Sequence, residues 1–227
     1  MTEQQEISAY NEWKDLCKRR GYYWPLYRYD IINHLTDLYG YVNYLEIGVH
    51  NGTCIRLVKA LHKDGVDPGA ENVIVPEVNY PMTSDAFFEL ISGHDIKYDI
   101  IFVDGLHHDY QVYKDIINAL KHLQPHGTIV CHDMNPPWEI VQRKERVVNA
   151  WNGDCWKAWV KLRGELTNVS MNVVDTDNGV GVIQFGTQEC ITLPDDAFNL
   201  TYQYLDSNRT EILNLISIDE FYDIYRK

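Results

Sequence analysis

The sequence predicts an α/β fold with a doubly wound, mainly parallel sheet, and two observations support this prediction. Through the first two thirds of the chain, short apolar runs alternate with segments of helical periodicity, the order expected of successive strand–helix units. Farther on, Asn178-Gly179 separates apolar segments at 171–174 and 180–183, and this dipeptide is the strongest short-range signal for a β-hairpin. We therefore expect a Rossmann-like sheet with an antiparallel C-terminal hairpin.

The predicted elements alternate in the order that such a sheet requires. A polar helix at residues 3 to about 19 comes first, and a helix at 31–39 precedes the first strand at 42–48. The next helix runs from residue 53 to about 61, because its apolar residues recur at i, i+3, i+4 and i+7. Its expected buried face comprises Cys54, Leu57, Val58 and Leu61.

The middle of the chain is less regular. A short strand ends at Val66-Asp67, and the loop at 69–81 that follows could hold one more strand at 73–75. Thr83 opens a helix that reaches Ile91, because Thr, Ser and Asp are good helix caps.

Five further segments complete the prediction. A strand at 99–103 precedes an amphipathic helix at 109–123 and a strand at 128–132. One or two helices span 138–163 before the hairpin, and two or three helices follow residue 192. We expect one domain over residues 1–227, with helical extensions at 1–40 and 192–227.

The composition excludes some partners. The chain has 227 residues, of which 45% are hydrophobic, and this is enough for a sizeable core. Its formal net charge is −13, whereas nucleic-acid binding needs a basic surface. No apolar run approaches the ~20 residues of a membrane span. We therefore expect neither a nucleic acid nor a membrane as partner; the Tyr- and Leu-rich C-terminal helices could form a homodimer surface.

The cysteines and the first residues bear on the cellular compartment. Five cysteines, an odd number without a C-x-x-C pair, indicate free thiols in a reducing environment. The segment 1–6 is acidic and unlike a signal peptide. A cytoplasmic location is the expectation. The cysteines are Cys17, Cys54, Cys131, Cys155 and Cys190.

Three predicted strands end in carboxylates, at Glu46, Asp104 and Asp133. Parallel strands place ligands at their carboxyl ends, so these residues are candidates for one site. If the strands of Asp104 and Asp133 are neighbours, their ends lie ~5 Å apart. Two carboxylates that close repel each other unless a proton or a cation lies between them, and oxygen ligands suit Mg²⁺. His132 could join, although adjacent side chains of a strand point in opposite directions. Alternatively, both aspartates are helix caps.

His107 and His108 follow Asp104 directly. Imidazole titrates near neutral pH, so either histidine could act as a general base beside a ligand. We prefer His107. The alternative is that both are ordinary surface or core residues.

The turn Glu46-x-Gly48-x-His50-x-Gly52 joins the first strand to a helix. Its glycines would let a ligand approach the backbone N–H groups, and the acid before them suits a ligand with an ammonium group. Asp67, 19 residues after Gly48, lies where a carboxylate commonly binds the two ribose hydroxyls, or it is only a turn residue before Pro68.

Ser84-Asp85 could bind an adenine amino group, cap the helix, or do both.

Together these residues resemble the class I S-adenosylmethionine-dependent methyltransferases, and more narrowly their metal-dependent sugar O-methyltransferase branch. The resemblance covers residues 28–186. It depends on the segments 44–52, 65–68, 82–85, 103–108 and 132–133. The segments Trp151–Lys157 and Asp175–Asp177 also resemble features of relatives; Trp156 or Lys157 could contact the substrate.

By position, the resemblance implies a role for each candidate residue. Glu46 would hold the methionine ammonium of S-adenosylmethionine, Asp67 its ribose, and Thr83, Ser84 and Asp85 would flank its adenine. The backbone cradle would comprise Gly48, His50, Asn51, Gly52 and Thr53.

The resemblance also implies a catalytic set. Asp104 would contact the cofactor and, with His132 and Asp133, bind Mg²⁺ or Mn²⁺, while His107, or else His108, would act as base. Two positions depart from the family pattern: His50 replaces the central glycine of the cradle, and His132 replaces an acid. The second departure removes one negative charge from the metal site.

We therefore expect an S-adenosylmethionine-dependent O-methyltransferase acting on a hydroxyl of a sugar, a glycan or a related small molecule, with help from a divalent metal. Three alternatives stay open: a metal-independent small-molecule methyltransferase, a dinucleotide-dependent oxidoreductase and a non-catalytic interaction module.

Overall fold

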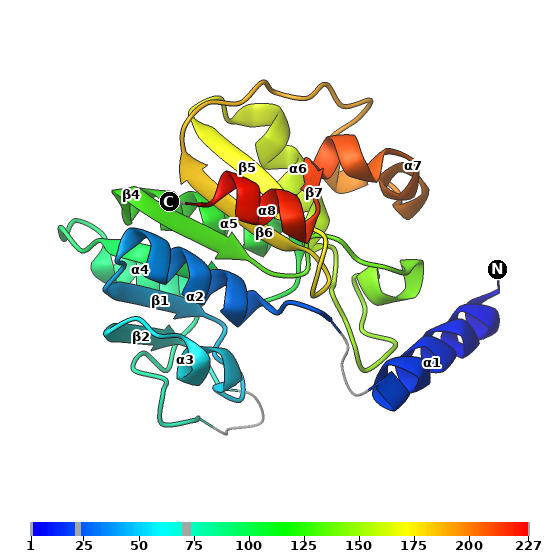
Figure 1. Cartoon of the computed structure of the whole chain (residues 1–227), viewed down its shortest axis with the longest axis horizontal. Helices are drawn as coiled ribbons and strands as arrows, with labels where there is room; N and C mark the ends of the chain where they lie inside the picture. Colours follow the sequence, from blue (N-terminus) through cyan, green and yellow to red (C-terminus); the bar gives the residue numbers. More distant parts are fainter. Residues whose placement is uncertain (1, 21–23, 70–73, 227) are drawn as a thin grey trace.

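The computed structural model describes residues 2–20, 24–69 and 74–226, and it contains one seven-stranded sheet (Figure 1). The strand order is β2-β1-β3-β4-β6-β5-β7. The strands are β1 (Asn43–Ile47), β2 (His62–Val66), β3 (Tyr98–Val103), β4 (Leu123–Cys131), β5 (Val169–Val174), β6 (Val180–Phe185) and β7 (Leu215–Ile216). The predicted doubly wound α/β sheet is confirmed.

The first four strands pair in parallel, and β6 pairs antiparallel with both β4 and β5. The carboxyl ends of β1, β3 and β4 therefore lie side by side. The predicted C-terminal hairpin is confirmed as β5–β6, with Val174 paired to Val180 across a five-residue turn. The turn needs a left-handed backbone, and Asp177, Asn178 and Gly179 have φ values of 44°, 61° and 87°.

Helices cover both faces of the sheet (Figure 1). One face packs against α2 (Arg28–Tyr39), α3 (Thr53–Leu57) and α8 (Ile218–Ile224). The other packs against α4 (Ser84–Ile91), α5 (Asp109–Lys121), α6 (Cys155–Glu165) and α7 (Tyr202–Leu213). Because consecutive residues of a strand alternate between faces, Tyr44 and Glu46 both point toward the α2 side.

The helix predicted at 53–61 is wrong in length, since α3 ends at Leu57. Leu57 and Leu61 are 48% and 76% exposed, whereas Cys54 and Val58 are buried. Asn33 of α2 binds the carbonyl of Leu57 and the N–H of Lys59, and this contact supports the extended backbone after the helix.

Other boundaries also differ. Of the strand predicted at 73–75, Val73 lies outside the described residues, and residues 74 and 75 form no strand. β4 begins at Leu123, five residues early, through an irregular register beside β3, and the short β7 was not predicted.

The helix α1 (Glu3–Arg20) lies beside the 3₁₀ helix η1 (Glu139–Gln142), at the lower right of Figure 1. Arg143, which follows η1, forms ion pairs with Glu3 and Glu6 of α1. A second 3₁₀ helix, η2 (Ala197–Asn199), lies beside α6.

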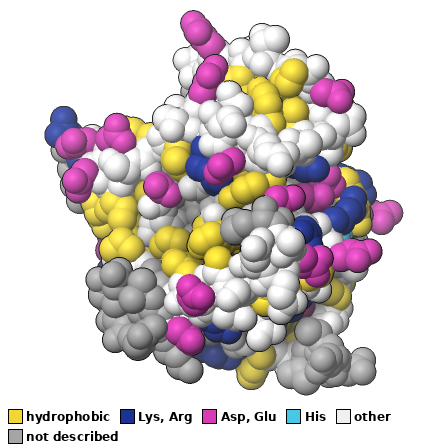
Figure 2. Space-filling model, turned by 90° about the vertical axis from the view of Figure 1, so that its right-hand side faces the viewer, with side chains coloured by type: hydrophobic (Ala, Val, Ile, Leu, Met, Phe, Trp, Pro, Cys, Tyr) yellow, Lys and Arg dark blue, Asp and Glu magenta, His cyan; other side chains and the backbone are white. Residues whose placement is uncertain are grey.

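The surface is consistent with the acidic composition: on the face shown in Figure 2, Lys and Arg side chains lie among Asp and Glu. None of the helices in the described ranges combines the length and apolarity that a membrane crossing requires. Cys54, Cys131, Cys155 and Cys190 are free thiols, as predicted, while the side chain of Cys17 lies outside the described part.

Candidate active site

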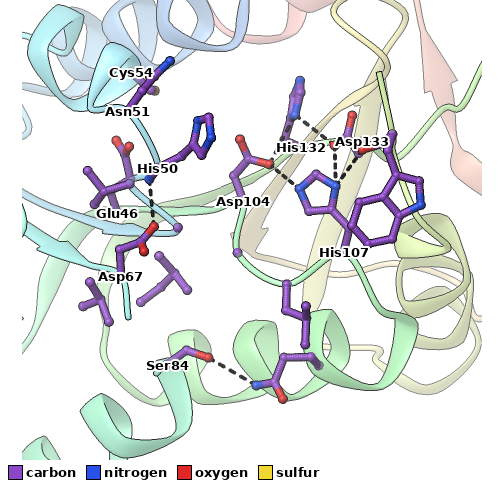
Figure 3. A pocket seen from close by; sticks show the side chains of 18 of the residues that line it. Glu46, His50, Asn51, Cys54, Asp67, Ser84, Asp104, His107, His132 and Asp133 are labelled. Carbon is purple, nitrogen blue, oxygen red and sulfur yellow. Dashed lines mark hydrogen bonds and ion pairs between the residues drawn. The ribbon is translucent and has the colours of Figure 1, made fainter. Parts of the chain in front are cut away.

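A cavity of about 850 Å³ opens at the carboxyl ends of β1, β3 and β4 (Figure 3), within the ~300–1,000 Å³ typical of small-molecule sites. Thirteen of the predicted site residues line it: Glu46, Gly48, His50, Asn51, Thr53, Asp67, Thr83, Ser84, Asp85, Asp104, His107, His132 and Asp133. The cavity lining includes neither Gly52 nor His108.

The turn after β1 forms one wall. Gly48 has φ 91°, and a Cβ there would lie 2.1 Å from the carbonyl oxygen of Asp104, so this glycine permits the close approach of the two strand ends. His50 adopts a left-handed φ of 48°, the conformation that would favour the glycine expected at this position. Its N–H donates to Asp67 Oδ2 at 2.8 Å, so Asp67 also fixes this turn.

Glu46 lies in β1 just before this turn and is buried, with 1% of its surface exposed. The hydroxyl of Tyr44 donates to its Oε2. Burial raises the pKa of Glu46 to about 8, although the Tyr44 hydrogen bond lowers it. At neutral pH this carboxyl is therefore mainly protonated until a cation arrives beside it.

Several polar side chains form hydrogen bonds between the start of α4 and the facing helix α5. Gln111, which the sequence did not single out, donates from Nε2 to Ser84 Oγ at 3.2 Å and to Asp85 Oδ1 at 3.0 Å. Asp85 also pairs with Lys114. Thr83 caps α4 by accepting from Ala86 N, as predicted. The contacts of Asp85 show a structural function, and its proposed contact with adenine remains a prediction.

At the centre of the cavity, Asp104, His107 and Asp133 form a cluster that could hold a metal ion. His107 Nε2 lies 3.2 Å from Asp104 Oδ1, and its Nδ1 lies 3.3 Å from Asp133 Oδ2. The two acidic strand ends thus face each other across one imidazole (Figure 3).

His132 reaches the same cluster, against the expectation that it would point away from Asp133. β4 ends at Cys131, and Asp133 has a left-handed φ of 64°, so the alternation of a strand no longer applies. His132 Nδ1 lies 3.3 Å from both Asp104 Oδ1 and Asp133 Oδ2.

Arg28 and Asp177 complete the cluster, and sequence reasoning missed their role. Arg28 Nη1 donates to Asp177 Oδ2 at 3.0 Å and lies 3.2 Å from His132 Nε2. Arg28 is the first residue of α2 and Asp177 belongs to the hairpin turn, so no local motif joins them. The hairpin signal at Asn178-Gly179 and the resemblance of Asp175–Asp177 to a feature of relatives both indicated this turn, but neither assigned it a role.

The charges in this cluster compensate one another. Burial would lower the pKa of His107, but Asp104 and Asp133 outweigh it and raise the value to about 9. Burial would also lower the pKa of His132, but the negative charges of Asp133, Asp104 and Asp177 outweigh it and raise that pKa well above its usual value. Despite burial, His132 and Arg28 lower the pKa of Asp177 to about 2. Three aspartates therefore face Arg28 and two imidazoles that favour their charged form.

The segment 151–154 holds this cluster in place. His107 Nδ1 donates to the carbonyl of Trp151 at 2.9 Å, and the two rings stack with centroids 5.3 Å apart. Asn152 Nδ2 donates to Asp133 Oδ1. Asp154 accepts from the N–H of Asp109 at the start of α5. Trp156 and Lys157 bind Gln142 and the carbonyl of Phe198 instead, and the cavity lining includes neither of them.

His108 takes a different position. It is the N-cap of α5, and its ring stacks on Tyr110. Its Nδ1 is buried without a hydrogen-bond partner among the described residues. Between the two predicted bases, the geometry favours His107.

The mainly parallel sheet brings a glycine turn, the acids Glu46 and Asp67 and the cluster of Asp104, His107 and Asp133 to one cavity, and this arrangement agrees with the resemblance to the class I methyltransferases. Residues 45–134 match the model of a family described as methyltransferase domain. The similarity to a methyltransferase domain thus covers 90 of the 227 residues.

Solved structures agree with the fold. An O-methyltransferase from Bacillus cereus, in complex with SAH, is 16% identical with a TM-score of 0.51 over 69% of this chain and 80% of its own. A candidate O-methyltransferase from Klebsiella pneumoniae is 15% identical with a TM-score of 0.50 over 70% of this chain and 80% of its own. No curated protein matches the sequence.

Proposed function

We propose that this protein transfers a methyl group from S-adenosylmethionine to a hydroxyl of a small molecule, with a sugar or glycan as the expected acceptor class. The observation that carries the proposal is the cluster of Asp104, His107 and Asp133 in the cavity next to Glu46 and Asp67. A sulfonium-bound methyl needs a deprotonated oxygen in line with it, and an alcohol is a poor acid. A base beside the cofactor site answers this need.

His107 is the proposed base, and its contacts identify the atom. The carbonyl of Trp151 can only accept, so Nδ1 keeps its hydrogen and Nε2 is the atom that takes up a proton. With a pKa of about 9, the base form grows as pH rises. We therefore expect kcat/KM to rise between pH 7 and 9.

The residues present fit a divalent metal. His132 Nδ1 lies 3.3 Å from both Asp104 Oδ1 and Asp133 Oδ2, so these three residues could hold an ion while His107 stays free to act as base. Two carboxylates and an imidazole suit Mn²⁺ at least as well as Mg²⁺, which prefers oxygen alone. A metal here would bind an acceptor oxygen and lower the pKa of its hydroxyl. The alternative set of Asp104, His107 and Asp133, whose ligand atoms lie within 4.8 Å of one another, would occupy His107 Nε2 and leave that residue unable to act as base.

A metal-independent reaction is the second candidate, and a specific observation favours it. Arg28, His107 and His132 already place positive charge against Asp104, Asp133 and Asp177. The guanidinium of Arg28, 3.7 Å from Asp104 Oδ2, supplies a fixed cation where the relatives of the sugar-methylating branch are expected to use an ion.

The test combines labelled methyl transfer with metal control. The purified protein is incubated with methyl-labelled S-adenosylmethionine and a panel of sugars, nucleotide sugars and catechols, before and after chelation and with Mg²⁺ or Mn²⁺ restored. Labelled ethers formed only with metal support the first candidate, and full activity after exhaustive chelation supports the second. Binding of NAD⁺ but not S-adenosylhomocysteine in calorimetry would contradict both.

The His107→Ala variant tests the base. We expect turnover to fall by ~10²- to 10⁴-fold while affinity for S-adenosylhomocysteine is kept, because a general base contributes on this scale. The His108→Ala variant is the matched control, since His108 lies outside the cavity lining and should keep most of its turnover. Unchanged turnover in His107→Ala would reject this assignment.

A further inference from the structure

The loop 143–152, which follows η1, forms the cavity wall away from the proposed cofactor residues. Strand β3 lies between β1 and β4, so the turn after β1 and the end of β4 lie on opposite sides of Asp104 (Figure 3). Asn152 of the loop donates to Asp133, just after β4, so the loop belongs to the second side. With the cofactor on the first side, the methyl acceptor meets this loop.

Arg146 brings a positive charge to this wall. It lines the cavity, is exposed to solvent and forms no ion pair within the described part of the chain. By contrast, Arg28, His107 and His132 at the centre of the cavity all lie against aspartates. Of the two arginines in the lining, Arg146 is therefore the one whose charge no described carboxylate neutralises.

Two carbonyl groups of the same loop hold the guanidinium of Arg146. Its Nε donates to the carbonyl of Val148 at 3.4 Å, and its Nη2 donates to the carbonyl of Asn149 at 2.7 Å. These two donors form one edge of the planar group, and the edge between Nη1 and Nη2 has no further acceptor among the described residues. Such an edge matches a pair of phosphate or carboxylate oxygens. Because the side chain is exposed, a ligand can reach it.

Helix α1 holds the loop on both sides of Arg146. Before it, Arg143 forms ion pairs with two glutamates of α1. After it, the N–H of Ala150 donates to the hydroxyl of Tyr10 at 3.2 Å. A loop that is already fixed costs less conformational entropy when a ligand binds to it. The wall is thus prepared for recognition.

The distance between Arg146 and the proposed base limits the size of the acceptor. His107 binds the carbonyl of Trp151, and the two rings stack. Arg146 and Trp151 are five residues apart in the chain, so their Cα atoms lie at most ~18 Å from each other. A sugar whose hydroxyl lies at His107 can therefore extend a charged substituent to Arg146 at the exposed rim.

We propose that Arg146 determines the specificity for the acceptor by binding an anionic group of the sugar through its Nη1–Nη2 edge. The inference rests on the proposed function and narrows its acceptor class to sugars that carry a phosphate or a carboxylate. A phosphate ester and a uronic acid are two sources of the same chemistry, and different probes distinguish them.

Calorimetry on the full chain saturated with S-adenosylhomocysteine tests the proposal. The probes are UDP-glucose, glucose 1-phosphate, D-glucuronate and D-glucose. We expect the wild type to bind an anionic probe roughly tenfold more tightly than D-glucose, and Arg146→Met to lose this preference. Arg146→Lys, which keeps the charge without the fork, should recover part of it. A preference for the phosphates identifies a phosphate ester, and a preference for D-glucuronate alone identifies a carboxylate.

The Lys144→Met variant is the matched control. It removes the same charge two residues away, and Lys144 does not belong to the cavity lining, so the variant should keep the full preference. S-adenosylhomocysteine should bind all these variants as tightly as the wild type, which shows that they are folded. Should Arg146→Met fail this check, Arg146→Gln takes its place.

Three results overturn the inference. The first is a wild type that binds S-adenosylhomocysteine but prefers no anionic probe to D-glucose. The second is a preference that Arg146→Met retains in full, and the third is an equal loss of preference in Arg146→Met and Lys144→Met. If S-adenosylhomocysteine does not bind the wild type at all, the proposed function itself fails.

Discussion

At the scale of single residues, Glu46 shows how burial can link a carboxyl to ligand charge. Its pKa of about 8 arises from burial, which outweighs the hydrogen bond from Tyr44. A buried protonated carboxyl costs less than a buried anion. A cationic ammonium beside it reverses this preference, because opposite charge favours the ionised form.

This reversal predicts proton release when the cofactor binds. We expect S-adenosylhomocysteine to bind more tightly as pH rises from 6 to 8, and to release close to one proton at pH 7. Calorimetry in buffers with different heats of ionisation measures that number directly. The Glu46→Gln variant should lose the pH dependence and bind roughly tenfold more weakly. A wild-type affinity that is flat between pH 6 and 8 contradicts the proposed coupling between ammonium binding and proton release from Glu46.

At the scale of residues, the sequence predicted the site well where an acidic side chain lies at the carboxyl end of a strand. Glu46, Asp104 and Asp133 follow or end buried strands, and the parallel order brings all three to one cavity. It was weak where contacts join distant segments, because Arg28 and Asp177 are 149 residues apart and meet only through the fold. Gln111 was missed for a similar reason, since its contacts with Ser84 and Asp85 cross two helices.

At the scale of elements, the segment 151–154 acts as a support for the reactive cluster. Gly153 has φ 61°, and a Cβ there would lie 1.9 Å from the carbonyl oxygen of His107. The backbone of one loop thus presses against the backbone of the other, and only glycine leaves room for this. The conformation also places the Trp151 carbonyl under the imidazole.

The Gly153→Ala variant should therefore displace His107 without removing any ligand contact. We expect turnover to fall at least tenfold with little change in affinity for S-adenosylhomocysteine, since a small misplacement of a reacting group lowers the rate strongly. The matched control is Gly164→Ala in α6, where an added Cβ meets atoms only at 3.6 Å and beyond. Loss of turnover in both variants alike, or in neither, would argue against a positioning role for this segment.

Element prediction from sequence succeeded where periodicity and caps agreed. Thr83 begins α4 as expected, and the hairpin forms around Asn178-Gly179. It failed for α3, where four apolar residues at helical spacing predicted a helix to residue 61. The contacts of Asn33 with the backbone after Leu57 come from another helix, so the local pattern could not show them.

At the scale of the whole molecule, buried ionisable groups are concentrated around the site, and most of them are paired with groups of opposite charge. Asp104, Asp133 and Asp177 are paired with Arg28 and two imidazoles, while Glu46 and Asp115 are buried carboxyls with raised pKa values. Parallel strand order could be predicted from the sequence, and with it the place of the site. The balance of charge could not, because it depends on the burial and contacts of each group.

This balance predicts how the stability of the whole molecule depends on pH. Burial raises the pKa of Glu46 from 4.5 to about 8 and that of Asp115 from 3.8 to about 6, so each one increasingly opposes folding as pH rises through these intervals. His107, with a pKa raised from 6.5 to about 9, stabilises the fold below 6.5, and this contribution is lost as pH rises through 9. All three effects have the same sign.

Carboxyl groups with lowered pKa values have the opposite effect on stability: they stabilise the fold at neutral pH and lose this contribution at low pH. Asp177, with a pKa lowered from 3.8 to about 2, loses its contribution as pH falls below 4. We therefore expect the Tm of the ligand-free protein to be highest near pH 5 and to fall steadily toward pH 9, although the net charge of −13 at pH 7 contributes repulsion in the same direction.

The Glu46→Gln variant separates the effect of the buried titrating groups on Tm from the effect of net-charge repulsion. Glu46→Gln removes one buried titrating group and changes the formal charge by only one unit, so its Tm should fall less than that of the wild type between pH 5 and 8. Calorimetric unfolding at constant ionic strength measures this difference, and added salt screens the general repulsion while leaving the buried group almost unaffected. Parallel Tm curves for the two proteins would mean that Glu46 is ionised in the folded protein throughout, and that the ammonium contact needs no proton release.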